Sequence, residues 1–152
     1  MIGHLTETEC KGFLKKEIVG RIGCSVNDET YVVPVNYLFD GNNIIAHSQE
    51  GKKIEMMRLN PKVCFEADDM KTLKNWRSVI AWGTYKEITD DTEKWDTLHN
   101  FVNRMMHFKF SETALPPEIM PQRMHPRSGK LKTVVFKIII DKLTGRYEIE
   151  DE

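Results

Sequence analysis

The chain has 152 residues, of which 40% are hydrophobic and 30% charged, and its 22 Lys and Arg side chains nearly balance 23 Asp and Glu side chains, giving a net charge of -1. This length and composition are typical of one globular domain, spanning residues 1–152, and not of a disordered chain. The balanced charge excludes the overall basic field that attracts nucleic acids or anionic membranes, so any anion site must be local.

The location of the protein is predicted from what the sequence lacks. No apolar run reaches the roughly 18 residues of a membrane span, and MIGHLTETEC has neither the basic nor the apolar region of a signal peptide. Cys10, Cys24 and Cys64 are odd in number and form no C-x-x-C pair. We therefore expect reduced thiols in a cytoplasmic protein that binds neither nucleic acid nor membrane. The histidines show no ligand spacing, so no metal site is predicted.

The first part of the chain predicts a short helix and then closely spaced strands. Thr6 and Glu9 form a capping box at the helix start, and Gly20 ends this unit. Turns at NDET and DGNN separate three expected strands. The second strand, YVVPVNYLF, is apolar almost throughout and is expected to be covered on both faces. Pro34 places it at a sheet edge or a bulge, because proline cannot donate to a β-ladder. The three strands span residues 21–26, 31–39 and 44–48.

The second part of the chain predicts a short helix and then two strands separated by a polar loop. A short helix over 52–59 ends before Asn60-Pro61. The next elements are a strand over 62–67, a polar loop over 68–75 and a long strand over 76–88.

A second helix follows, capped by Asp90. Its apolar positions keep helical spacing and should be buried, whereas His99 and His107 should be solvated. A proline-rich loop containing His125 covers 111–130, and residues 133–141 form the last strand. Short, evenly spaced strands with few helices predict an antiparallel barrel flanked by helices. The apolar helix positions are Trp95, Leu98, Val102, Met105 and Met106.

Residues 44–53, IIAHSQEGKK, join a polar strand end to a glycine and two lysines at a helix start. The first N–H groups of a helix have no internal partner, and the helix dipole adds positive charge there. With Lys52 and Lys53 this segment suits an anion, although a solvated basic turn explains it equally well. The spacing of a Walker loop is absent. His47 either donates to the same ligand or only caps its strand.

The long fifth strand carries a second candidate residue, Ser78, in the sequence NWRSVIAWG. Alternation places Ser78, Ile80 and Trp82 on one face of the strand. Trp82 is expected to be a core aromatic residue.

Taken in order, the segments GRIGCS, YVVPVNY, IIAHSQEGKK, NPKVCFEAD and RSVIAWGTYKEI resemble the pyridoxamine 5′-phosphate oxidase-like family of FMN-binding split barrels. Within that family the sequence is most similar to the branch that includes nitroimidazole-resistance reductases. The resemblance covers residues 1–110 and the last strand, TVVFKIIIDKLTGR. It implies a mainly β fold with flanking helices: an antiparallel Greek-key split β-barrel that forms a homodimer with FMN at the subunit interface.

The resemblance also implies which residues bind FMN. The family's flavin-contacting strand corresponds to residues 32–37, and its phosphate-binding basic pair corresponds to Lys52 and Lys53. Ser78, with Arg77 beside it, would reach the flavin from the partner chain, and His47 is the candidate catalytic residue. The implied cofactor-binding residues are Val33, Pro34, Val35, Asn36, Ala46, His47, Ser48, Lys52, Lys53, Arg77 and Ser78.

The activity that the resemblance implies is FMN-dependent reduction of a small organic acceptor, as in a nitroreductase. The substrate-phosphate positions and the arginine-rich C-terminal strand of true pyridoxamine phosphate oxidases have no counterpart here, so that activity is not expected. The alternatives are a flavin-binding module without turnover, a split barrel that binds haem or a deazaflavin, and a structural dimer with an empty cleft.

Overall fold

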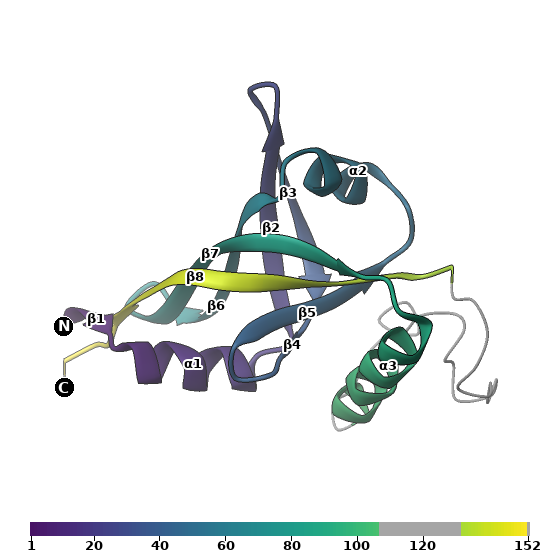
Figure 1. Cartoon of the computed structure of the whole chain (residues 1–152). Coiled ribbons are helices and arrows are strands. Elements are labelled where there is room, and N and C mark those ends of the chain that lie inside the picture. The colour runs from purple at the N-terminus through teal and green to yellow at the C-terminus, as the bar shows by residue number, and fades with distance from the viewer. Residues whose placement is uncertain (107–131, 152) are drawn as a thin grey trace.

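The computed structural model describes residues 1–106 and 132–151, and the description that follows is confined to them. Every strand pair is antiparallel, and the strands form one sheet in the order β3-β2-β6-β7-β8-β5-β4, with β1 paired to β8. The elements are β1 Ile2–Leu5, α1 Glu7–Lys16, β2 Val19–Val26, β3 Glu29–Asn36, β4 Leu38–Phe39, β5 Asn43–Ser48, α2 Lys52–Leu59, β6 Lys62–Thr72, β7 Asn75–Ile88, α3 Asp91–Met105 and β8 Val134–Glu148 (Figure 1).

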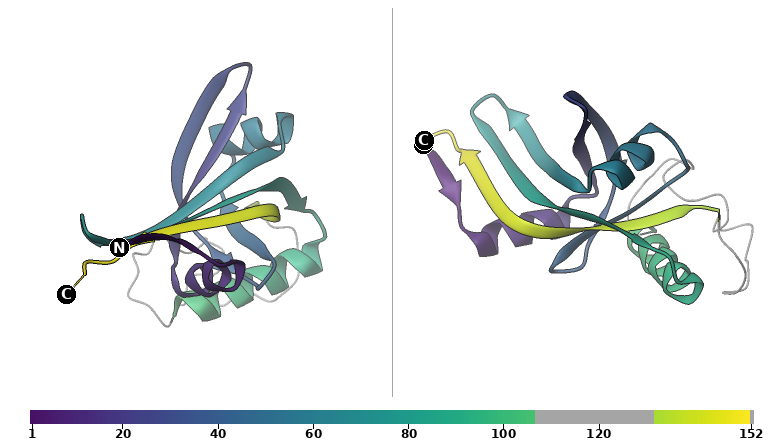
Figure 2. Two further views of the ribbon diagram at one scale, coloured as in Figure 1. Left: turned by 90° about the vertical axis from the view of Figure 1, so that its left-hand side faces the viewer. Right: turned by 45° about the horizontal axis from the view of Figure 1, so that its top comes forward.

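The sheet curls into a split barrel because its two edge strands follow each other in the chain. Only Tyr37 separates β3 from β4, and its backbone N–H donates to the Ile18 carbonyl at 3.0 Å. The opposite ends of the sheet, β3 and β4, are thereby held next to each other, although no β-ladder joins them (Figures 1 and 2). The predicted antiparallel split barrel with flanking helices is confirmed.

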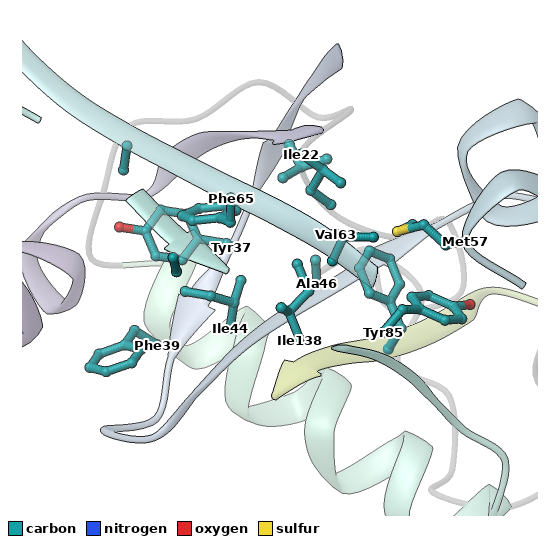
Figure 3. Close-up of a cluster of buried hydrophobic side chains, with 14 of the residues drawn as sticks. Ile22, Tyr37, Phe39, Ile44, Ala46, Met57, Val63, Phe65, Tyr85 and Ile138 are labelled. Carbon is teal, nitrogen blue, oxygen red and sulfur yellow. The ribbon is translucent and has the colours of Figure 1, made fainter. Parts of the chain in front are cut away.

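The inner face of the curled sheet carries the main hydrophobic core (Figure 3). Tyr37 and Phe65 meet there edge to face, with ring centroids 4.7 Å apart. Helix α2 adds Ile54, Met56 and Met57 to the same cluster. The apolar side of α2 therefore fixes where its polar N-terminus lies relative to the sheet.

Helix α3 forms a second, smaller core on the other side of the β5–β8 pair. Leu98 and Phe101 are each 1% exposed and pack there with Val135 of β8. Most of the predicted apolar stripe is buried, but Met106 lies just beyond the last turn and is 62% exposed. His99, expected to be solvated, is half-buried beside Trp95, with ring centroids 6.1 Å apart. His107, His125 and the predicted loop over 111–130 lie outside the described residues.

Two of the C-terminal carbonyls of α1 find partners on distant elements. The last four carbonyls of a helix have no helical donor. Glu17 N–H donates to Phe13, the buried Tyr37 hydroxyl donates to Leu14 at 2.7 Å, and Arg104 of α3 donates to Lys15. This helix end therefore ties the closure of the barrel to α3.

Replacing Tyr37 by Phe is expected to lower the free energy of unfolding by about 1–3 kcal/mol, because the Leu14 carbonyl would stay buried without a donor. Urea denaturation of both proteins measures the difference. An unchanged unfolding midpoint would show that solvent reaches this carbonyl and that the hydrogen bond does not stabilise the fold.

Local signals in the sequence located the caps and turns correctly. Thr6 and Glu9 form the predicted capping box, and the Asp90 side chain accepts from Glu93 N–H at 2.9 Å. The β2–β3 turn contains Asn27 and Asp28, both with positive φ, as in a tight hairpin. Pro34 lies in the edge strand β3, as predicted.

Several predictions of strands and loops were wrong. The segment 31–39 is two strands and not one, and it is not covered on both faces, since Val32 is 65% exposed. Residues 68–75 belong mostly to the β6–β7 hairpin, whose strands pair along their length and satisfy the backbone of this polar sequence. Gly20, expected to end the helical unit, lies inside β2. The short strand β1 was missed, and β8 runs well past the expected residue 141.

The position of Trp82 was also predicted wrongly. Its ring faces outward, is 39% exposed and lies under the Lys142 ammonium, 5.0 Å from the ring centroid. The register between β7 and β8 shifts directly after it, at Gly83. A Cβ on Gly83 would lie 2.2 Å from the Ile139 carbonyl oxygen, so only glycine permits this close approach of the strands.

Candidate functional site

The segment implied to contact a flavin, Val33–Asn36, lies on the free edge of the sheet. Strand β3 pairs with β2 on one side, and no strand among the described residues pairs with its other side. An edge strand presents unpaired backbone N–H and C=O groups, and Pro34 removes one of the donors. This edge can therefore offer in-plane hydrogen bonds to a flat heterocyclic ligand.

The end of β5 places its three implied residues in different surroundings. Ala46 is 1% exposed and faces the main core. His47 is half-buried and faces α3, where its ring lies edge to face on Phe101, with centroids 4.7 Å apart. The Ser48 hydroxyl donates to the Gln49 carbonyl at 2.7 Å. His47 is thus held by the packing of α3, and its predicted contact with a flavin stays a prediction.

Helix α2 begins with no side chain capping it. Gly51 is the N-cap residue, in extended conformation, and no side chain accepts from the first amides. Lys52 Nζ lies 2.6 Å from Glu29 Oε1 and 5.1 Å from the centre of the Tyr31 ring. The hydrogen bond from Lys52 to Glu29 raises the pKa of this lysine. Lys52 therefore already has an anionic partner on β3.

Lys53 differs from Lys52 because it is half-buried and forms no ion pair with any acidic residue of the described chain. Burial lowers the pKa of its ammonium group, and no charged neighbour offsets this effect. A partly desolvated cation without a counter-ion is stabilised by an incoming anion. Among the cations of α2, Lys53 is therefore the one best prepared to receive an anion.

Ser78 lies on the outer face of the sheet, in a cluster of charged side chains. Its hydroxyl is 3.4 Å from Glu66 Oε2, while Arg21 Nη1 lies 3.3 Å from Glu66 Oε1 and 3.1 Å from Asp68 Oδ2. Burial, and next the neighbouring Asp68, raise the pKa of Glu66. Arg21 also stands opposite Pro34 in the β2–β3 register, which links this cluster to the β3 edge.

Arg77 and Ser78 cannot serve one ligand from the same face. Successive side chains of a strand point to opposite faces. Ser78 is on the side of Glu66, whereas Arg77 is on the side of α1. Hydrogen bonds from Thr6 lower the pKa of Glu9 on that helix, and the charge of Arg77 adds a smaller lowering. Only Ser78 belongs to the outer face.

One chain does not bring Ser78 and the two lysines together. Lys52 contacts Glu29 at the tip of the β2–β3 hairpin, and Pro34 lies five residues along the strand, a distance of about 16 Å. Ser78 is on the side of Pro34 and Arg21. The implied binding residues therefore form two separate groups on this chain.

The outer face also has a shallow hollow of about 420 Å³. Trp82, Val32 and Cys64 line it. The hollow is not predictable from the sequence pattern, which indicates a core position for Trp82. Lys62 and Asp141 lie at the same hollow and bring charges of both signs. An apolar centre with charged groups beside it is a common arrangement in protein–protein interfaces.

Residues 6–147 match the pyridoxamine 5′-phosphate oxidase family. The chain belongs to this family. A protein of Rhizobium meliloti (strain 1021) whose function is uncharacterised is 28% identical over 149 residues, which are 93% of this chain and 92% of the relative. The match to the family agrees with the resemblance that the strand segments and the GKK segment show.

Solved structures of other proteins share the fold. A FAD-binding protein from Mesorhizobium loti is 26% identical, with a TM-score of 0.73 and coverage of 97% of this chain and 98% of its own. A proposed 5-nitroimidazole antibiotic resistance protein from Bacteroides thetaiotaomicron is 20% identical, with a TM-score of 0.68 and coverage of 97% and 89%. The second likeness concerns the fold alone.

No helix in the part of the chain that the structure describes is both long and apolar enough to cross a membrane.

Proposed function

We propose that this member of the pyridoxamine 5′-phosphate oxidase family binds FMN and reduces a small organic acceptor. The observation that carries the proposal is Lys53, a half-buried ammonium without an acidic partner among the described residues, at the start of a helix that has no side-chain cap. The phosphate monoester of FMN is the anion that satisfies this group. The relative from Mesorhizobium loti that binds FAD supports a flavin as the ligand class.

Each group of residues has a distinct task in this proposal. Lys53 and the first amides of α2 hold the phosphate, with Lys52 as a second cation once it leaves Glu29. The free backbone edge of Val33–Asn36 orients the ring. A bound flavin supplies the electron-transfer chemistry, and the protein supplies binding and orientation. No side chain is assigned a proton-transfer role, because His47 packs against Phe101.

We further propose that two chains form a homodimer with the flavin between them. Support comes from the separation of Ser78 from the lysines on one chain and from the partly apolar outer face around Trp82. Ser78 of one chain would then complete the site that begins at Lys53 of the other. The sheet face that carries Trp82 and Ser78 would be covered in the dimer.

The test is a spectrum and a titration of the purified protein. We expect flavin absorbance, one FMN per chain, and a mass of two chains by light scattering. FMN should also raise the melting temperature by mass action. A Soret band would instead identify a haem protein, and a monomer that binds FMN stoichiometrically would refute the dimeric site. Turnover of NADH or NADPH with and without nitroaromatic acceptors separates an enzyme from a flavin-binding module.

A further inference from the structure

The last turn of α2 carries an arginine that links three parts of the chain. Arg58 donates to both oxygens of Glu50, at 2.8 and 2.9 Å, and to both oxygens of Glu87 on β7, at 2.8 and 3.2 Å. The Tyr85 hydroxyl donates to Glu87 at 2.7 Å. A guanidinium that contacts two carboxylates through four donor–acceptor pairs is well ordered for a surface group.

Glu50 is the important member of this network because of its place in the chain. It comes directly before the N-cap residue Gly51 and the two lysines. A carboxylate at this position is attracted by free helix amides and by nearby ammonium groups. In the structure Glu50 does not cap the helix; it is bound to Arg58, eight residues further on.

The electrostatic balance around α2 explains what this contact achieves. Lys52 is paired with Glu29, and Arg58 is paired with Glu50 and Glu87. Lys53 is left without an acidic partner among the residues that the structure describes. Since Glu50 is the nearest acidic residue before Lys53 in the chain, its capture by Arg58 removes the most immediate intramolecular competitor for an anionic ligand.

We infer that Arg58 is a positioning residue that holds the Glu50 carboxylate away from the N-terminus of α2 and so keeps Lys53 and the helix amides open to a phosphate. This inference rests on the proposed function for the identity of the phosphate. It differs from a role in direct binding, because Arg58 would act only through Glu50. It also assigns Glu87 and Tyr85 the task of holding Arg58 in place.

The experiment compares the full-length wild-type protein with Arg58→Gln, Glu50→Gln and the double variant, and uses Lys86→Gln, an exposed cation beside Glu87, as the control. We expect Arg58→Gln to weaken FMN binding roughly tenfold, because the freed Glu50 carboxylate would place a negative charge a few ångströms from the phosphate. Riboflavin affinity should not change. Glu50→Gln alone should bind FMN as tightly as the wild type or more tightly. The double variant should recover the affinity that Arg58→Gln loses.

A ligand-free measurement separates this inference from the proposed function. In Arg58→Gln, the backbone amide resonances of Lys53 and Ile54 should shift as the freed Glu50 reaches the helix start, and they should return in the double variant. Absence of this shift overturns the inference whatever FMN does. Loss of FMN affinity in Glu50→Gln, with no recovery in the double variant, overturns it too. If the shift appears but the wild type binds FMN no better than riboflavin, the proposed function fails and the role of Arg58 stands.

Discussion

Replacing Lys53 by Ala should weaken FMN binding by about 10- to 150-fold, because one charge-assisted hydrogen bond contributes about 1.5–3 kcal/mol. Lys53 is the half-buried cation of α2 that has no acidic partner among the described residues, so its ammonium is available to the phosphate. Riboflavin lacks the phosphate, and its affinity should hardly change. Fluorescence titration with FMN, FAD and riboflavin measures all three affinities.

The other cation of the pair provides an internal comparison. Lys52→Ala should have a smaller effect than Lys53→Ala, because Lys52 must first give up its contact with Glu29. For the same reason, Glu29→Gln should tighten FMN binding. Lys16→Ala, an exposed lysine on α1, is the matched control and should not alter binding.

Two results would contradict the phosphate assignment. If Lys53→Ala and Lys52→Ala both leave FMN affinity intact, GKK is a solvated basic turn. If Lys53→Ala weakens riboflavin as much as FMN, the residue supports the fold of the site and not the phosphate. A preference for FAD over FMN in the wild type would keep the lysines as phosphate ligands but replace the cofactor.

Replacing Leu98 by Ala should lower the free energy of unfolding by about 2–5 kcal/mol, the range for a large aliphatic side chain removed from a packed core. Leu98 is 1% exposed and lies in the cluster that joins α3 to β8. The melting temperature should fall by roughly 5–15 °C for a protein of this size. Met106→Ala, at an exposed position after the same helix, should change stability by less than about 0.5 kcal/mol.

This substitution also tests whether α3 contributes to the ligand site. His47 touches Phe101 of α3, so a displaced helix could move His47. We expect FMN affinity to stay the same at temperatures where Leu98→Ala is folded, because the stripe has a packing role. Weaker flavin binding with unchanged stability would show that α3 positions His47 at the cofactor.

Several features of this protein were predictable because each depends on a few neighbouring residues. The capping box of Thr6, the cap at Asp90 and the hairpin turn at Asn27 are local chemistry. Pro34 pointed to an edge strand because a missing N–H is tolerated only where no further ladder forms. The order of short motifs was enough to place the chain in its family.

Only the tertiary structure decided which positive charges remain without an acidic partner and so can bind an anionic ligand. The pairing of Lys52 with Glu29 spans 23 residues, and that of Arg58 with Glu87 spans 29, so no local pattern shows either. Trp82 faces outward because it alternates with the buried residues Val79, Ala81 and Gly83 of β7, and only the closed sheet shows which face of the strand is the inner one. The sequence by itself therefore determined the fold family and the presence of a basic helix start. Which lysine lacks a partner, and which carboxylate is kept away from it, depends on long-range contacts that form only when the sheet closes.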